Sequence, residues 1–150
     1  MSDFTADDQG TLAALVDMII PASARYGVPG AADPAIFADI LSDAQRHRER
    51  LGEALAALDA LARDAHGAGF ADLTAGQRGG VTDTFRATHA GDAGLIAAVT
   101  AQCYYRDDRV MDSIGMEPRP PHPLGYEVAQ GDWSLLDPVR GRDTMVRKTS

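Results

Sequence analysis

The sequence predicts an all-α fold: a compact bundle of five to six helices over residues 1–115, followed by a long, extended, proline-rich C-terminal tail over residues 116–150. Apolar residues recur at helical spacing through the first part, and no segment alternates apolar and polar residues as a strand would. The length of 150 residues also suits one domain with one core. Amphipathic helices of this kind bury their apolar faces by packing into a bundle.

The first helix is predicted to begin at Thr5 and to end before Pro21. Thr5-x-x-Asp8 is a variant of the capping box, in which side chains satisfy the free N–H groups of the first turn. Proline then ends the helix because it disfavours the helical conformation of the residue before it. The expected buried face comprises Leu12, Leu15, Val16 and Ile19.

A short helix and a long helix are predicted next, after a loop with two prolines and two glycines. Asp33 is expected to cap the short helix, with Pro34 at its first position. Ser42-x-x-Gln45 resembles a second capping box and predicts the start of a long helix that runs to His66. The apolar faces comprise Ile36, Phe37, Ile40 and Leu41 in the short helix, and Leu51, Leu55, Leu58, Ala62 and Ala65 in the long one.

Three further helical segments are predicted before residue 116. Thr74-x-x-Gln77 offers a third capping box, although glycines at positions 76, 79 and 80 weaken that helix by about 1 kcal/mol each relative to alanine. Asp92 is expected to cap the next helix, and a final turn over residues 108–114 ends at Gly115. Core residues predicted for this part are Phe70, Leu73, Val81, Phe85, Leu95, Ile96, Val99 and Cys103.

The charge balance argues against two classes of partner. The chain has 22 acidic and 14 basic residues, a net charge of −8, which disfavours binding to nucleic acid or to an anionic membrane surface. Residues 1–115 carry 17 acids and 9 bases, whereas the tail carries five of each, so the acidity belongs to the bundle. No apolar run is long enough to span a bilayer, and no signal peptide is recognised, so we expect a cytoplasmic protein.

No catalytic, cofactor-binding or metal-binding residues are predicted in this chain. The four histidines have no metal-ligand spacing, and nucleophile-elbow, phosphate-loop and haem-attachment motifs are not found. Cys103, the single cysteine, is expected to be a buried and inert thiol. One alternative is a stand-alone enzyme that uses His122 with Glu127 or Asp132 as an acid–base set in the tail loop.

Two regions are candidates for contact with a partner. The tail carries regularly spaced apolar residues, which must pack either on the chain's own bundle or on a partner. Tyr104 and Tyr105 precede an Arg/Asp-rich turn that includes Arg109. They are either one core and one rim tyrosine or an aromatic anchor at an interface. The apolar residues of the tail are Tyr126, Val128, Trp133, Leu135, Leu136, Val139 and Met145.

Several motifs, taken in order, resemble those of the gluconate 2-dehydrogenase subunit 3 family. The resemblance covers the chain from about Thr11 to Arg142, and the C-terminal run is its most specific part. The motifs are Leu15-Val16-Asp17-x-Ile19-Ile20-Pro21, Pro29-Gly30-Ala31, Tyr104-Tyr105-x-Asp107-x-Arg109-Val110, Pro123-x-Gly125-Tyr126-Glu127 and the run from Asp132 to Arg140.

The resemblance implies a small, noncatalytic subunit. Its expected partner is a large FAD-dependent flavoprotein of the glucose–methanol–choline type that oxidises sugars, sugar acids or polyols, and a cytochrome c subunit often completes such a complex. The FAD and the catalytic base belong to the large subunit. Members often begin with a twin-arginine signal, which is not seen here. The complex is therefore expected in the cytoplasm, or in the periplasm if the chain is exported with its partner.

These observations lead to the hypothesis of an accessory subunit that helps its flavoprotein partner to fold, remain stable or reach its compartment. The alternative to a partner-bound tail is a self-contained helical scaffold or homodimer, with the tail on its own bundle. The residues predicted to form the partner interface are Tyr104, Tyr105, Arg109, Pro123, Tyr126, Trp133, Leu135, Leu136, Pro138 and Arg140.

Overall fold

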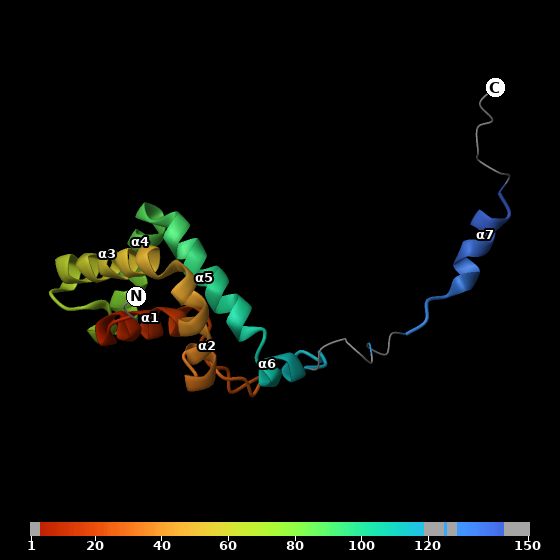
Figure 1. The fold of residues 1–150 in the computed structure, drawn as a ribbon, viewed down its shortest axis with the longest axis horizontal. Coiled ribbons are helices and arrows are strands. Elements are labelled where there is room, and N and C mark those ends of the chain that lie inside the picture. The colour runs from red at the N-terminus through yellow and green to blue at the C-terminus, as the bar shows by residue number, and fades with distance from the viewer. Residues whose placement is uncertain (1–3, 119–124, 126–128, 143–150) are drawn as a thin grey trace, which may run out of the picture. The chain divides into compact units, whose positions relative to one another are not determined.

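A computed structural model of the chain describes residues 4–118, 125 and 129–142. The chain divides into two units, Met1–Pro118 and Arg119–Ser150. The described residues of the first unit form a bundle of six α-helices, α1 to α6 (Figure 1). Those of the second contain one short helical segment. The predicted all-α bundle is therefore confirmed.

The first two helices begin where the capping residues predict. In α1 (Ala6–Ile19), the Thr5 hydroxyl accepts from the backbone N–H of Asp8 at 3.1 Å, and the Asp8 carboxylate accepts from the Thr5 N–H at 3.0 Å. In α2 (Pro34–Ala44), the Asp33 carboxylate accepts from the N–H of Ala35 at 3.1 Å. Each cap accepts hydrogen bonds from backbone N–H groups of the first turn, which have no partner within the helix.

The predicted capping box at Ser42 is wrong. Ser42 lies inside α2, and a 3₁₀ turn over Gln45–His47 separates that helix from α3 (Arg48–His66). The buried face of α2 includes Ile40 and Ala44, on either side of Ser42, so packing keeps the backbone helical through the serine. Tertiary contacts here override the local tendency of serine to start a helix.

The buried face of α3 matches the prediction except at its end. Leu51, Leu55, Leu58 and Ala62 are buried, whereas Ala65 is exposed. Residues 63–66 are all exposed, which means that the last turn extends past the core. Gly67 then ends the helix with φ +74°, a conformation that glycine adopts without strain.

The helices that follow are placed largely as predicted, with one correction. Thr74 and Gln77 form the expected capping box at the start of α4 (Ala75–Thr88). Asp92 does not cap α5 (Ala90–Tyr104), because α4 leads into α5 through His89 alone and the helix begins two residues before Asp92. Asp92 instead accepts a hydrogen bond from Arg50 at 2.7 Å. The last helix of the bundle is α6 (Asp108–Ser113).

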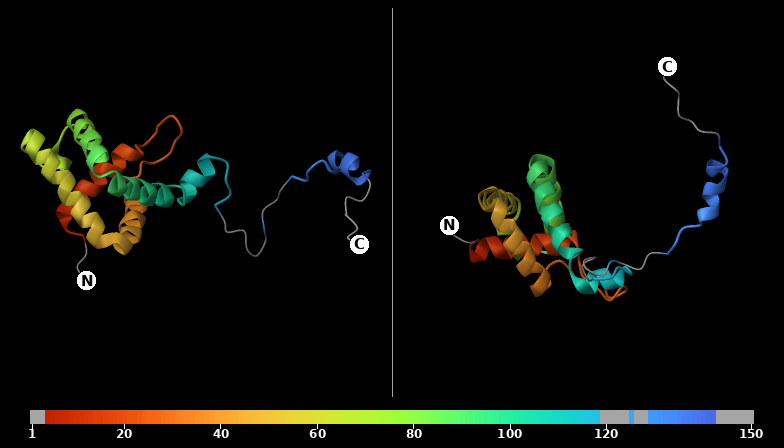
Figure 2. Two further views of the ribbon diagram at one scale, coloured as in Figure 1. Left: turned by 90° about the horizontal axis from the view of Figure 1, so that it is seen from above. Right: turned by 45° about the vertical axis from the view of Figure 1, so that its right-hand side comes forward.

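The core lies between α1, α3 and α5, with α2 packed on α5 and α4 packed on α3 (Figures 1 and 2). Phe70 and Phe85 fill its centre with the leucines of α1 and α3. In all three views, the loop after α1 and helix α6 lie side by side at one end of the bundle. No helix in the described part of the chain is long and apolar enough to cross a membrane.

We predict that Leu58→Ala and Leu55→Ala each destabilise the bundle by about 2–5 kcal/mol. Both side chains are buried in α3, so truncation removes packing and leaves a cavity. Urea denaturation followed by circular dichroism measures the change. Ala65→Ser, at an exposed position of the same helix, is the control and should change stability by less than about 0.5 kcal/mol. Two leucine variants that unfold like the parent would contradict this core.

Candidate functional site

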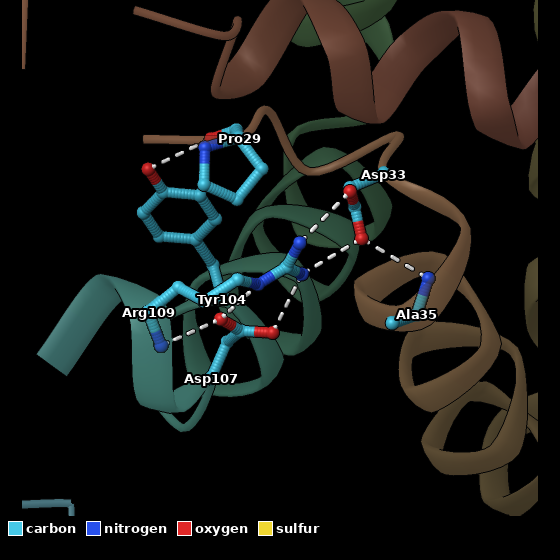
Figure 3. Close-up of polar contacts among 6 residues, drawn as sticks. All are labelled: Pro29, Asp33, Ala35, Tyr104, Asp107 and Arg109. Atoms are coloured by element: carbon cyan, nitrogen blue, oxygen red, sulfur yellow. Dashed lines mark hydrogen bonds and ion pairs between the residues drawn. The ribbon is translucent and has the colours of Figure 1, made fainter. Parts of the chain in front are cut away.

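Three segments that are distant in the sequence meet at one end of the bundle. They are the end of α1, the loop over residues 20–33 and the turn between α5 and α6 over residues 104–109, and we call this meeting point the corner (Figure 3). Three of the motifs quoted above therefore lie together in space. The motifs after residue 118 belong to the second unit.

The two adjacent tyrosines occupy different environments. The Tyr104 side chain is buried, and its hydroxyl donates a hydrogen bond to the carbonyl oxygen of Pro29 at 3.1 Å. Burial raises the pKa of Tyr104, which keeps this hydroxyl a donor. Tyr105 is 56% exposed and meets Tyr104 edge to face, with ring centroids 5.2 Å apart. The pair is thus one core and one surface tyrosine, and Tyr105 alone is available to a partner.

Arg109 joins two helix starts through its guanidinium group. Nη1 and Nη2 donate to the two carboxylate oxygens of Asp33 at 3.2 and 2.8 Å. Nε and Nη2 donate to the two oxygens of Asp107, each at 2.9 Å (Figure 3). Asp33 is also the N-cap of α2, and Asp107 is the N-cap of α6. Bidentate pairing of this kind is specific in geometry as well as in charge.

The electrostatics of the corner favour the ionised pairs. Hydrogen bonds from Arg109 are the main reason that the pKa values of Asp33 and Asp107 lie below their ordinary value. The same bonds, first to Asp107 and then to Asp33, raise the pKa of Arg109. A carboxylate held ionised in this way is a poor general acid or base near neutral pH. The cluster is a structural clamp.

Close packing within the loop after α1 explains the glycine of the Pro29-Gly30-Ala31 motif. The Ala31 N–H donates to the carbonyl oxygen of Ile20 at 2.8 Å, which brings the two ends of the loop together. A side chain at Gly30 would place its Cβ 2.7 Å from the backbone nitrogen of Ala22, closer than real Cβ atoms approach. Glycine is therefore required for the loop to close on itself.

Cys103 directly precedes Tyr104, at the edge of the corner, and is fully buried. Burial raises the pKa of its thiol to about 11, so the nucleophilic thiolate is disfavoured. Its Sγ lies 3.6 Å from Asp43, which in turn pairs with Arg106 at 3.1 Å. These contacts tie α2 to α5. The predicted burial of this cysteine is confirmed.

A groove of about 830 Å³ runs between α1, α4 and α5. Its charged lining residues are Asp83 and Arg86, and small side chains predominate elsewhere. The other residues that line the groove are Leu15, Met18, Ile19, Gly79, Thr82, Phe85, Ala87, Ala90, Ala93, Gly94 and Ala97.

Among the described residues, no group of three or more histidine, cysteine, aspartate or glutamate side chains is placed to hold a metal ion.

The described tail residues form one helical segment, in which a 3₁₀ turn over Trp133–Leu136 leads into α7 (Asp137–Arg140). Asp132 caps it by accepting from the N–H of Ser134 at 3.0 Å. Pro138 lies in the first turn of α7, and Arg140 pairs with Asp137 at 3.4 Å. Trp133, Leu135, Leu136 and Val139 are all exposed. Pro123 and Tyr126, as well as His122 and Glu127 of the alternative acid–base set, lie outside the described residues.

Of the predicted interface residues, Tyr104, Tyr105 and Arg109 lie together at the corner. Trp133, Leu135, Leu136, Pro138 and Arg140 share the helical segment of the second unit. Sequence reasoning identified Asp33 only as a helix cap and missed its pairing with Arg109, because the two residues lie 76 positions apart. The available signal is that an aspartate which caps a helix still has a charged carboxylate with which it can bind an arginine, as Asp33 does.

The fold and the corner define an all-α protein whose clustered charged groups are used to hold helices together. The sequence model of the family described as Gluconate 2-dehydrogenase subunit 3 matches residues 6–110. The chain belongs to this family, whose name describes one subunit of a dehydrogenase complex. Comparisons with curated proteins and with solved structures gave no significant match. The match ends before the tail, so the resemblance of the C-terminal motifs stays a prediction.

We predict a pH-dependent loss of stability for Asp33→Asn. Asparagine keeps a side-chain oxygen to cap α2 but loses the charge that pairs with Arg109. Because the folded state lowers the pKa of Asp33, this contribution is present above the unfolded value of about 3.9 and is lost as the pH falls through the folded pKa. The melting temperatures of parent and variant should therefore differ at pH 7, begin to approach each other below about pH 3.9, and converge once the pH falls below the lowered pKa of folded Asp33.

Thermal melts between pH 2 and pH 7 measure this difference. Asp17→Asn changes an exposed aspartate of α1 and serves as the charge-matched control. A gap between parent and Asp33→Asn that is the same at every pH, or that the control reproduces, would count against the clamp.

Proposed function

We propose that the protein is the noncatalytic small subunit of an FAD-dependent sugar, sugar-acid or polyol dehydrogenase. It stabilises or matures a large flavoprotein of the glucose–methanol–choline type, and the FAD is bound by that partner. Membership in the subunit 3 family over residues 6–110 carries this proposal. The chemistry of the described residues supports it, because Arg109 of the corner pairs with Asp33 and Asp107 and the single thiol is buried.

In the proposed complex, this chain binds the flavoprotein and takes no part in the oxidation that the flavoprotein catalyses. A cytochrome c subunit is a further proposed member, which would accept electrons from the flavin. We propose a cytoplasmic location, or a periplasmic one when the chain is exported together with its partner. In neither compartment does the chain itself contribute a cofactor.

The helical segment of the tail is proposed to provide one contact with the flavoprotein. Trp133 and Leu136 are three residues apart, and Leu135 and Val139 are four apart, so their side chains lie on one broad face of the segment. Ser134 and Asp137 lie on the other face. All four apolar side chains are exposed, and Trp133 is 61% exposed. Exposed aromatic and aliphatic side chains on a short capped helix are typical of a recognition element.

A second candidate function is a self-contained scaffold or homodimer. The same four exposed apolar side chains favour it, since a second copy or the chain's own bundle could also cover them. The two candidates differ in what the tail binds. Size-exclusion chromatography of the chain alone and of the chain with the flavoprotein separates them.

Co-expression with a flavoprotein encoded beside this chain tests the proposed function. The two polypeptides should purify together, with flavin absorption in the complex, and the isolated chain should be colourless. Flavoprotein expressed without this chain should be less soluble or less stable. Flavin that stays with the isolated chain through dialysis, with no second polypeptide present, would overturn the proposal.

We predict that Trp133→Ala weakens binding of the flavoprotein by about 30- to 1000-fold. A tryptophan at the centre of an interface commonly contributes about 2–4 kcal/mol, and 1.4 kcal/mol corresponds to a factor of ten. Titration calorimetry measures the affinity, and thermal melts measure the isolated chain. Gln130→Ala, an exposed neighbour, is the control. Unchanged partner binding together with a lower melting temperature of the isolated chain would show that the tail packs on its own bundle.

A further inference from the structure

The exposed large apolar side chains of the first unit gather at one end of the bundle. Among its described residues, they are Tyr26, Tyr105, Ile114 and Met116, each more than half exposed. Tyr26 lies in the loop after α1, and the other three lie between the end of α5 and the residues after α6. Elsewhere in the described part of this unit, the large apolar side chains are buried or partly buried.

The loop and α6 are held side by side. In every view of Figures 1 and 2, the loop after α1 lies along α6. The ion pair between Arg109 and Asp33 and the hydrogen bond from Tyr104 to Pro29 connect the two elements. The segments that carry the four exposed side chains therefore lie together at one end of the bundle, and we call these four residues the bundle-end patch.

Local hydrogen bonds fix both halves of the bundle-end patch. Ser23 and Val28 exchange two backbone hydrogen bonds, at 3.1 and 3.2 Å, so Tyr26 lies in the turn of a small hairpin. At the end of α6, the N–H of Met116 donates to Met111 at 2.9 Å, and Gly115 adopts φ +75°. This is a Schellman motif, which sets the direction of the chain after the helix. A patch ordered in this way loses little conformational freedom on binding.

The bundle-end patch combines apolar side chains with acidic neighbours. The chain carries a net charge of −8. At the corner, Asp33 and Asp107 pair with Arg109, whereas Asp108 and Asp112 of α6 are exposed. The surface thus offers tyrosine, isoleucine and methionine side chains next to exposed carboxylates of α6. Tyrosine and methionine are enriched in protein–protein interfaces, where the phenol hydroxyl also finds a polar partner.

We propose that the bundle-end patch docks on an apolar surface of the large dehydrogenase subunit, as a contact separate from the helical segment of the tail. This inference rests on the proposed function, and it identifies Tyr26, Ile114 and Met116 as interface residues. The family name describes one subunit of a dehydrogenase complex, and this supports another subunit as the occupant of the patch. The patch also continues in sequence into the tail, since Met116 lies two residues before the end of the first unit.

Two double variants of the full chain test the bundle-end patch: Tyr26→Ser with Tyr105→Ser, and Ile114→Ser with Met116→Ser. Each should weaken binding of the flavoprotein by about 30-fold or more, as expected for interface hot spots. The melting temperature of the isolated chain should fall only slightly, because more than half of each of the four side chains is exposed. Ala65→Ser, at the end of α3 that lies away from α6, is the control and should bind like the parent.

The outcomes separate this inference from the proposed function. If the parent chain binds the flavoprotein and both double variants bind equally well, the bundle-end patch is overturned and the proposed function stands. If the parent chain does not bind the flavoprotein, the proposed function and the bundle-end patch inference are both wrong. If the variants abolish a homodimer and leave flavoprotein binding intact, the occupant is a second copy and the inference is wrong. If the Ile114→Ser, Met116→Ser variant unfolds, the binding measured with the Tyr26→Ser, Tyr105→Ser variant decides whether the inference holds. Tyr26 lies in the turn of the hairpin and Tyr105 is exposed at the end of α5.

Discussion

The pairing of Arg109 with two aspartates is the interaction on which this end of the molecule depends. One guanidinium group holds the caps of α2 and α6, two helices that are far apart in the chain. An exposed ion pair by itself contributes little to stability. Here the geometry matters more than the energy, because the same contact fixes the loop after α1 against the turn that follows α5. Together with the hydrogen bond from Tyr104 to Pro29, that contact holds the surface that the loop and α6 present.

Features encoded by neighbouring residues could be predicted from the sequence. The capping residues Thr5, Asp33 and Thr74 lie where the spacing indicates, and the apolar periodicity identifies most of the core. The chemistry of Ser42 and Asp92 suits a helix cap and predicts a helix start at each residue. Packing on both sides of Ser42, and the direct passage from α4 to α5 before Asp92, decide otherwise. Both errors are cases in which tertiary structure overrides a local preference.

The candidate site was predictable only in part. The Tyr104–Arg109 turn is visible as a motif, but the sequence does not reveal which tyrosine is buried or which carboxylate Arg109 binds across 76 residues. Tyr26 gave no signal, because it lies in a loop between Arg25 and Gly27 without apolar periodicity. Its importance appears only once the loop is seen beside α6. Long-range pairing, which depends on the whole fold, is the information that spacing does not contain.

The burial of Cys103 has a consequence for how motion in the bundle can be observed. It is the only cysteine of the chain, its thiol is inaccessible, and its raised pKa disfavours the reactive thiolate. A thiol reagent can therefore modify it only when α5 separates locally from α2, and the modification rate is set by that opening equilibrium. The chain thus carries an internal reporter, at the edge of the corner, of how often its helices come apart. A partner that holds the corner closed would slow that reaction without touching the sulfur.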